Sequence, residues 1–202
     1  LSEKNLTVYN SPLLFRVSGN PLSIERLRQA LGKIIEKHTI LRTSLRFDSA
    51  NGNLMQQIQS NNQFIFSITS ADDKRSIESI FSDECNNQTH FNLEEGQVFR
   101  CHIVRQGSSV LDKNDDDLLS IGDWIIFNFH HVAFDGETER IFLNELQHFY
   151  SNQQNNQKLM LQYIDYSVYE HKMNMSSSIT YWHELLSDYN FIKSMNLPYD
   201  RK

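Results

Sequence analysis

The sequence has no excess of basic residues and no long apolar segment. Its 202 residues carry 19 Lys and Arg against 25 Asp and Glu, a formal net charge of −6. Nucleic-acid-binding proteins instead carry a basic patch or stripe. No apolar run approaches the roughly 20 residues that a membrane-spanning helix needs, and no signal peptide opens the chain. These features argue against nucleic-acid and membrane partners, and they predict a cytoplasmic protein.

Cysteine is also scarce. Cys85 and Cys101 lie far apart and lack the CxxC spacing of redox and metal motifs. We expect both to be reduced thiols in a core, as in a cytosolic protein. The first residue is Leu1 rather than Met, so we expect the chain to be a piece of a longer polypeptide. Its length suits one domain with a real core.

The apolar pattern predicts short strands interspersed with amphipathic helices. Alternation or short apolar runs predict strands at residues 13–18, 43–47, 54–59, 64–68, 98–104 and 125–131. Helical spacing predicts helices at residues 23–38, 137–150, 163–173 and 179–186, the first capped by Ser23. It also predicts a helix that is capped by Asp72 or Asp73 and carries Ile77, Ile80, Phe81 and Cys85. A polar hairpin loop is expected at residues 106–117. This order predicts an α+β fold, a two-layer α/β sandwich with a mostly antiparallel or mixed sheet.

The most informative segment is residues 125–136, where an apolar strand ends in His130 and His131. Because side chains alternate along a strand, the two rings should leave opposite faces of the sheet. That favours one positioned acid/base group over a zinc site, since no third ligand stands at metal spacing. With an ordinary pKa of ~6.5, His131 can take and return a proton near neutrality. Two structural, hydrogen-bonded histidines are an alternative that the residues alone leave open.

Asp135 and Gly136 follow the two histidines. A carboxylate in the position of Asp135 suits pairing with a cation and holding the turn. Gly136 permits the unusual backbone angles of a sharp turn, and its N–H at the start of a helix can stabilise a developing oxyanion. The six remaining histidines are expected to be surface or structural residues: His38, His90, His102, His148, His171 and His183.

Residues 130–136 match the HHxxxDG motif of the chloramphenicol acetyltransferase-like superfamily. Four further segments make the chain resemble, more narrowly, the condensation domains of nonribosomal peptide synthetases. In family order they are KHTILRT at 37–43 (RHxxLRT with Lys37 for Arg), FNLEEGQVFR at 91–100 (FDLxxGPLxR), QYIDY at 162–166, and YW at 181–182 with LPYDR at 197–201.

The resemblance implies one catalytic residue, His131, and a set of residues that shape its site: His130, Asp135, Gly136, Thr138 and Arg42. It implies that Asp135 pairs with an arginine, for which Arg42 is the candidate. Thr138 keeps the hydroxyl of the serine that is common in the family.

The implied activity is amide formation between a carrier-bound acyl or peptidyl thioester and a carrier-bound aminoacyl amine. No cofactor would be bound directly, because the substrates arrive on phosphopantetheine arms. The implied partners are upstream and downstream carrier-protein domains, an adenylation domain and a second condensation lobe in the parent chain. Two alternatives are a non-catalytic module that docks carrier proteins and a coenzyme A-dependent acyltransferase, against which the QYIDY and LPYDR segments argue.

On this interpretation residues 1–202 are the N-terminal lobe of a condensation domain. Residues 11–150 would form its core, and residues 151–202 a linker and helices that lead toward the second lobe. The isolated lobe is expected to be inactive, because half of the wall of the substrate tunnel is missing.

Overall fold

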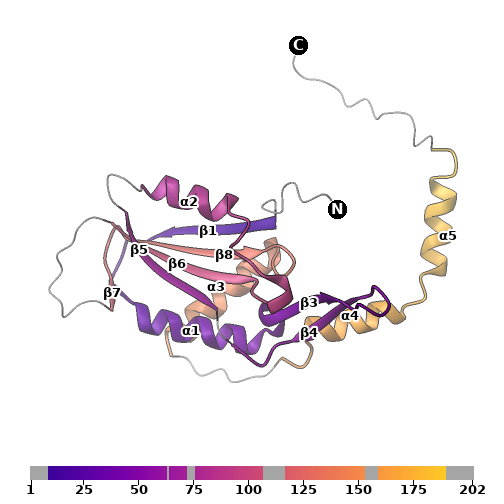
Figure 1. The fold of residues 1–202 in the computed structure, drawn as a ribbon, viewed down its shortest axis with the longest axis horizontal. Coiled ribbons are helices and arrows are strands. Elements are labelled where there is room, and N and C mark those ends of the chain that lie inside the picture. The colour runs from indigo at the N-terminus through magenta and orange to yellow at the C-terminus, as the bar shows by residue number, and fades with distance from the viewer. Residues whose placement is uncertain (1–8, 63, 72–75, 107–116, 153–158, 190–202) are drawn as a thin grey trace, which may run out of the picture. The chain divides into compact units, whose positions relative to one another are not determined.

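The computed structural model describes residues 9–62, 64–71, 76–106, 117–152 and 159–189. The chain divides into two units, Leu1–Ile164 and Asp165–Lys202. The first unit is built on a four-stranded sheet in the order β1-β8-β6-β5, with bounds Asn10–Arg16, Trp124–His130, Phe99–Gln106 and Ile65–Ala71 (Figure 1). Its β1–β8 and β6–β8 pairs are antiparallel and β5–β6 is parallel. The predicted mixed sheet is confirmed.

Helices cover both faces of this sheet (Figure 1). On one face lie α1 (Ile24–Lys37) and α3 (Gly136–Tyr150), and the ring of Phe142 packs against Phe99, Phe127 and Phe129. On the other face lies α2 (Ile77–Asn86), where Ile80 packs with Val104 and Ile126. The expected α/β sandwich is therefore confirmed, with α2 as an additional cover on the second face.

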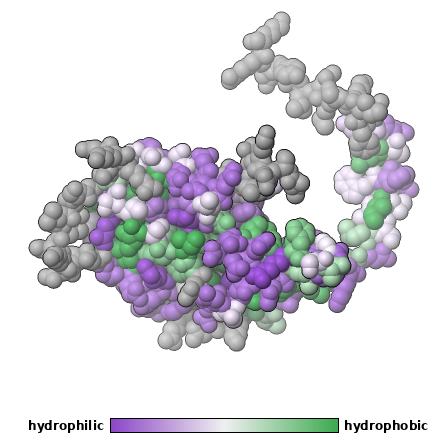
Figure 2. Space-filling model, viewed as in Figure 1, coloured by the Kyte–Doolittle hydropathy of each residue, from purple (hydrophilic) through white to green (hydrophobic). Residues whose placement is uncertain are grey.

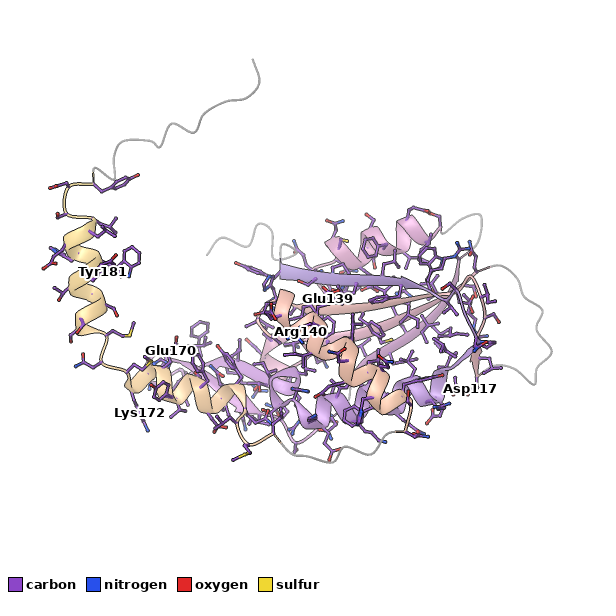
Figure 3. The ribbon with its side chains drawn as sticks, turned by 180° about the vertical axis from the view of Figure 1, so that it is seen from behind. Asp117, Glu139, Arg140, Glu170, Lys172 and Tyr181 are labelled. Atoms are coloured by element: carbon purple, nitrogen blue, oxygen red, sulfur yellow. The ribbon has the colours of Figure 1, made fainter. Side chains whose placement is uncertain are left out.

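Helix α1 forms as its sequence predicts. The Ser23 hydroxyl accepts a hydrogen bond from the Arg26 N–H at 3.1 Å, which satisfies one of the free donors of the first turn. The Asp117 carboxylate, labelled in Figure 3, accepts from the Glu25 N–H at 2.8 Å and adds negative charge at the same helix end. The side chains at helical spacing turn to the core: Leu27, Ala30, Leu31, Ile34 and Ile35 are all buried.

Helix α2 begins later than expected. Its N-cap is Ser76, whose hydroxyl accepts from the Ser79 N–H at 3.3 Å. The expected cap at Asp72 or Asp73 is therefore wrong, and both of these residues lie outside the described ones. Most of the expected hairpin loop at 106–117 also lies outside the described residues.

Shorter elements complete the two units. They are β2 (Leu22–Ser23) paired with β7 (Leu118–Leu119), η2 (Thr39–Arg42), the hairpin of β3 (Thr43–Phe47) and β4 (Leu54–Ile58), η3 (Leu93–Glu95), α4 (Tyr163–Lys172) and α5 (Ser176–Leu185). The first unit reaches beyond residue 150, because the Gln162 side chain bonds the Thr39 N–H and the Lys37 carbonyl at 3.1 and 2.9 Å. Helix α5 exposes large apolar side chains, among them Ile179 and Trp182. Figure 2 shows the surface coloured by hydropathy.

Gly96, which ends the FNLEEG segment, is required by close packing. Its φ is +71°, and a Cβ on it would lie 3.2 Å from the carbonyl carbon and oxygen of Arg42 and from the Ser44 nitrogen. These neighbours are backbone atoms that cannot rotate away. The FNLEEG segment thus needs its glycine to lie against the start of β3.

Replacement of Gly96 with alanine is expected to destabilise the chain by about 2 kcal/mol or more, because a left-handed alanine is strained and its methyl group is overpacked. The shift of the urea denaturation midpoint measures it. Gly32→Ala is the matched control: it lies inside α1 with no atom within 4 Å of the added Cβ, and it should stabilise the helix by up to about 1 kcal/mol. Equal midpoints for the two variants would contradict this role of Gly96.

Candidate active site at the end of strand β8

The two histidines lie where the central strand β8 ends. The His130 N–H donates to the Val98 carbonyl at 2.9 Å, and the His131 N–H donates to the Tyr9 carbonyl at 2.8 Å. β8 ends at His130, one residue earlier than expected, so His131 lies in the turn after the strand. The backbone on both sides of the site is therefore fixed by hydrogen bonds to neighbouring segments.

The ring of His130 is half-buried between aromatic side chains. Its centroid lies 5.6 Å from that of Tyr9 and 5.7 Å from that of Phe91. Its Nδ1 accepts the Val132 N–H at 3.1 Å, which closes the turn. Burial, followed by the neighbouring His131 ring, lowers the pKa of His130. His130 is thus a neutral structural ring that shapes the turn.

The side chain of His131 is exposed, and so is that of the next residue, Val132. An imidazole held by its backbone but open at its ring can meet a substrate from solvent. Of the two histidines, the structure leaves His131 available for chemistry.

Asp135 and Thr138 form the N-terminal cap of α3. The Asp135 Oδ1 accepts from the Thr138 N–H at 2.9 Å and from its hydroxyl at 2.6 Å. These bonds, the one from the hydroxyl first, lower the pKa of Asp135. The cap orients the first turns of α3, where Glu139 and Arg140 are labelled in Figure 3.

The expected pairing of Asp135 with Arg42 is not formed between these two described residues. The Arg42 guanidinium instead donates to the backbone carbonyls of Ile35 and Gln59. It ties the end of α1 to the residue that follows β4, while the Asp135 carboxylate is used as a helix cap. The KHTILRT arginine therefore holds the scaffold behind the site.

Gly136 is the first residue of α3, and among the described glycines a positive φ occurs at Gly52, Gly96 and Gly122. The expectation of an unusual backbone at Gly136 is wrong, because this glycine already has the helical conformation. No atom lies within 4 Å of the Cβ that another residue would carry there. Gly136 thus keeps the approach to the helix N-terminus open beside His131.

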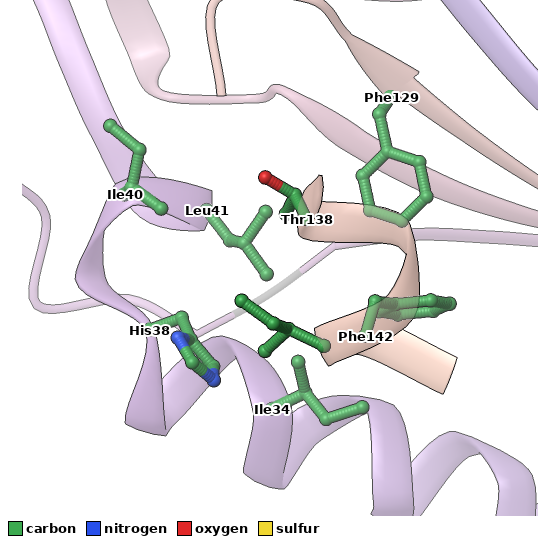
Figure 4. Close-up of a pocket in the computed structure, with 8 residues that line it drawn as sticks. Ile34, His38, Ile40, Leu41, Phe129, Thr138 and Phe142 are labelled. Carbon is green, nitrogen blue, oxygen red and sulfur yellow. The ribbon is translucent and has the colours of Figure 1, made fainter. Parts of the chain in front are cut away.

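A small cavity of about 40 Å³ lies behind the turn (Figure 4). Its lining is apolar apart from His38 and the Thr138 side chain. The His38 Nε2 lies 2.7 Å from the Glu145 Oε2, and Glu145 also pairs with the Lys37 Nζ at 2.6 Å. Sequence reasoning missed Glu145, and its helical neighbourhood carries no motif that marks it. The cavity is too small for a substrate and belongs to the packing beneath the site.

Neither a metal centre nor a membrane helix is found in the part of the chain that the structure describes. It holds no cluster of three or more His, Cys, Asp or Glu side chains arranged for a metal ion. Its helices include none that is long and apolar enough to cross a bilayer. Cys85 and Cys101 are free thiols, of which Cys101 is buried. Burial raises the pKa of Cys101, which makes this thiol an inert core residue.

Solved structures share this architecture. An X-domain from teicoplanin biosynthesis, solved in a complex with OxyB, aligns with a TM-score of 0.76 at 18% identity over 99% of this chain and 43% of its own. The epimerization domain of tyrocidine synthetase B aligns at 0.68, with 20% identity over 96% and 43%. The condensation domain of the Monacolin K polyketide synthase aligns at 0.67, with 19% identity over 90% and 38%. The fold is therefore that of the condensation-type, chloramphenicol acetyltransferase-like class.

The family follows from the sequence match. The family model described as "Condensation domain" matches residues 1–202, so the chain belongs to the condensation-domain family. Bacitracin synthase 1 of Bacillus licheniformis is 27% identical over an alignment 209 residues long, gaps included, that covers 99% of this chain and 4% of that protein. Gramicidin S synthase 2 of Brevibacillus brevis is 26% identical over an alignment 204 residues long, which covers 98% of this chain and 4% of that protein. The chain thus spans a small fraction of the synthetases that it matches.

Proposed function

We propose that this chain is the N-terminal lobe of a nonribosomal peptide synthetase condensation domain, and that His131 serves amide formation in the parent protein. The observation that carries the proposal is the exposed side chain of His131, whose backbone N–H donates to the Tyr9 carbonyl between the end of β8 and the start of α3. That arrangement presents one imidazole at the N-terminal turn of α3, where a substrate can reach it.

Amide formation requires one group that accepts a proton. The acceptor amine attacks the carbonyl carbon of the donor thioester, so that a C–N bond forms and the C–S bond breaks. The proton that the nitrogen loses passes to the His131 imidazole and then to the departing thiolate. The Gly136 N–H at the start of α3 would favour negative charge on the carbonyl oxygen.

Both substrates would be carried on phosphopantetheine arms, so no cofactor is held by this lobe itself. The partners are then donor and acceptor carrier-protein domains, an adenylation domain and the second condensation lobe of the parent chain. This assembly would work in the cytoplasm. The similarity to synthetases that the chain matches over most of its own length supports this context.

A second candidate is a non-catalytic docking module. It is favoured by the similarity to the X-domain, which was solved in a complex with another protein, OxyB. In that case the histidine turn would serve as a structural element, and carrier proteins or another partner would bind without reaction.

The assay for the first proposal uses the parent polypeptide with donor and acceptor thioesters loaded on carrier proteins, and mass spectrometry follows the amide product. Product from the parent supports condensation. Carrier binding without product supports the docking module. The isolated chain should give no product, because the chain spans about 40% of the solved condensation-type structures, and efficient turnover by it would contradict the lobe assignment.

A further inference from the structure

A buried carboxylate lies on α2, on the side of the sheet away from α1 and α3. Glu84 is 1% exposed, and its Oε1 lies 2.7 Å from the His102 Nδ1 and 3.1 Å from the Arg100 Nη2. Its Oε2 accepts from the Asn128 side chain at 2.9 Å. A buried charge is tolerated only where such partners surround it. Burying the Glu84 carboxylate costs free energy, and the strands that its partners belong to show what the network holds in place.

The backbone carbonyl of the same residue joins two strands. It accepts from the Asn128 side chain of β8 at 2.8 Å and from the Asn10 side chain of β1 at 3.2 Å. Asn10 is the register partner of His130, and Asn128 lies two residues before it. The two asparagines therefore clamp the first residue of β1 and the end of β8 to one peptide group of α2.

This clamp lies next to the bond that holds the candidate base. Tyr9, whose carbonyl accepts the His131 N–H, directly precedes Asn10. A shift of β1 against β8 by one residue would break the Asn10 bond and move the Tyr9 carbonyl away from His131. Strand register is otherwise set by side-chain patterning, and strand ends fray most easily. A buried polar anchor at this end prevents both.

We propose that Glu84 is a positioning residue for His131, acting through Asn10 and Asn128. The proposal deepens the proposed function, since it concerns the same site. Glu84 does not touch substrate. It fixes where the turn leaves the sheet, and it does so from the face opposite to α3.

The test measures amide hydrogen exchange by NMR in the 202-residue chain. Glu84→Gln replaces the anionic acceptor with an amide, and Asn10→Ala removes the donor that joins β1 to α2. In both variants the amides of His130 and His131 should exchange on the order of tenfold faster, as expected when a hydrogen bond to a charged or buried group is lost. The amides of Val17 and Gly122, at the opposite end of the sheet, should keep their rates.

Matched controls separate positioning from general loosening of α2. Glu78→Gln makes the same exchange of side chain at an exposed position of the helix, and Asn86→Ala removes an exposed asparagine that bonds Ser82 within the helix. Neither should change exchange at His130 or His131. A uniform acceleration across the sheet, or unchanged rates at the two histidines, would overturn the proposal. Should Glu84→Gln fail to fold, Asn10→Ala decides, because Asn10 is half-buried in an edge strand.

A second readout is kinetic and uses the parent polypeptide. Misplacement of the base should lower kcat roughly ten- to hundredfold in the Glu84→Gln variant, with KM for the acceptor unchanged. If the wild-type parent makes no amide at all, the proposed function fails, yet the exchange experiment still decides whether Glu84 positions the turn. The two failures are thus distinguishable.

Discussion

Replacement of His131 with alanine is expected to reduce peptide product by a factor of about 10²–10⁴, the usual contribution of a positioned general base. The variant should fold as the wild type does. The His131 side chain is exposed, and the hydrogen bond to Tyr9 is donated by the His131 backbone N–H, which alanine retains. Changes at such surface positions are usually within about 0.5 kcal/mol of neutral. Product formation by the parent polypeptide, followed by mass spectrometry, and a thermal melt measure the two effects.

Val132→Ala is the matched control, because Val132 is exposed in the same turn and its N–H bond to His130 is kept in the variant. Its product yield should stay close to that of the wild type. If His131→Ala gives as much peptide product as the wild type but binds carrier proteins differently, the catalytic assignment is contradicted and the docking module is supported. Loss of product in both variants would indicate that the shape of the turn matters rather than the imidazole.

Local signals in the sequence predicted the elements around the site. The helix expected at 23–38 is α1, Ile24–Lys37, because the apolar spacing and the Ser23 cap are both contained in adjacent residues. The strand expected at 43–47 is β3, Thr43–Phe47, with the same bounds. The histidine strand was located for the same reason. These elements are specified within a few residues of chain.

Long-range partners could not be predicted in the same way. The family resemblance implied that Asp135 pairs with Arg42, but the Asp135 carboxylate bonds Thr138 and the Arg42 guanidinium bonds backbone carbonyls. Glu84 lies 44 residues from Asn128 in sequence. A glutamate on a short amphipathic helix carries no local sign that it faces a sheet, so this anchor became visible only with the fold.

Removal of the Glu84 carboxylate is expected to have the largest effect on stability. In Glu84→Ala, Arg100 and His102 lose the carboxylate that both contact, and Arg100 is left as a nearly buried cation. Breaking a buried pair from one side typically costs about 3–5 kcal/mol. Glu78→Ala, on the exposed face of the same helix, should cost less than about 1 kcal/mol. Urea denaturation at pH 7 measures both, and equal midpoints would contradict the anchoring role.

The dependence on pH gives a sharper test of the same carboxylate. Burial, the largest single influence, raises the pKa of Glu84, but hydrogen bonds from His102 and Asn128 and the charges of Arg100 and His90 outweigh it, so the pKa lies below its ordinary value of 4.5. A lowered pKa in the folded state means that the unfolded chain binds the proton more readily. The stabilisation is therefore complete above about pH 4.5 and is lost as the pH falls through the folded value.

Burial lowers the pKa of His90 below its ordinary value of 6.5, so the folded state favours the neutral ring. The free energy of unfolding therefore begins to fall as the pH drops below about 6.5. The wild-type free energy of unfolding should thus decline from about pH 6.5 downward, and more steeply once Glu84 takes up its proton. The difference in the free energy of unfolding between wild type and Glu84→Ala should keep the value that it has at pH 7 down to about pH 4.5. It should shrink as the pH falls further, because a protonated Glu84 no longer offsets the charge of Arg100. Denaturation curves between pH 7 and pH 3 measure this difference, and one that stays constant over that range would show that Glu84 stabilises the chain by packing rather than by its charge.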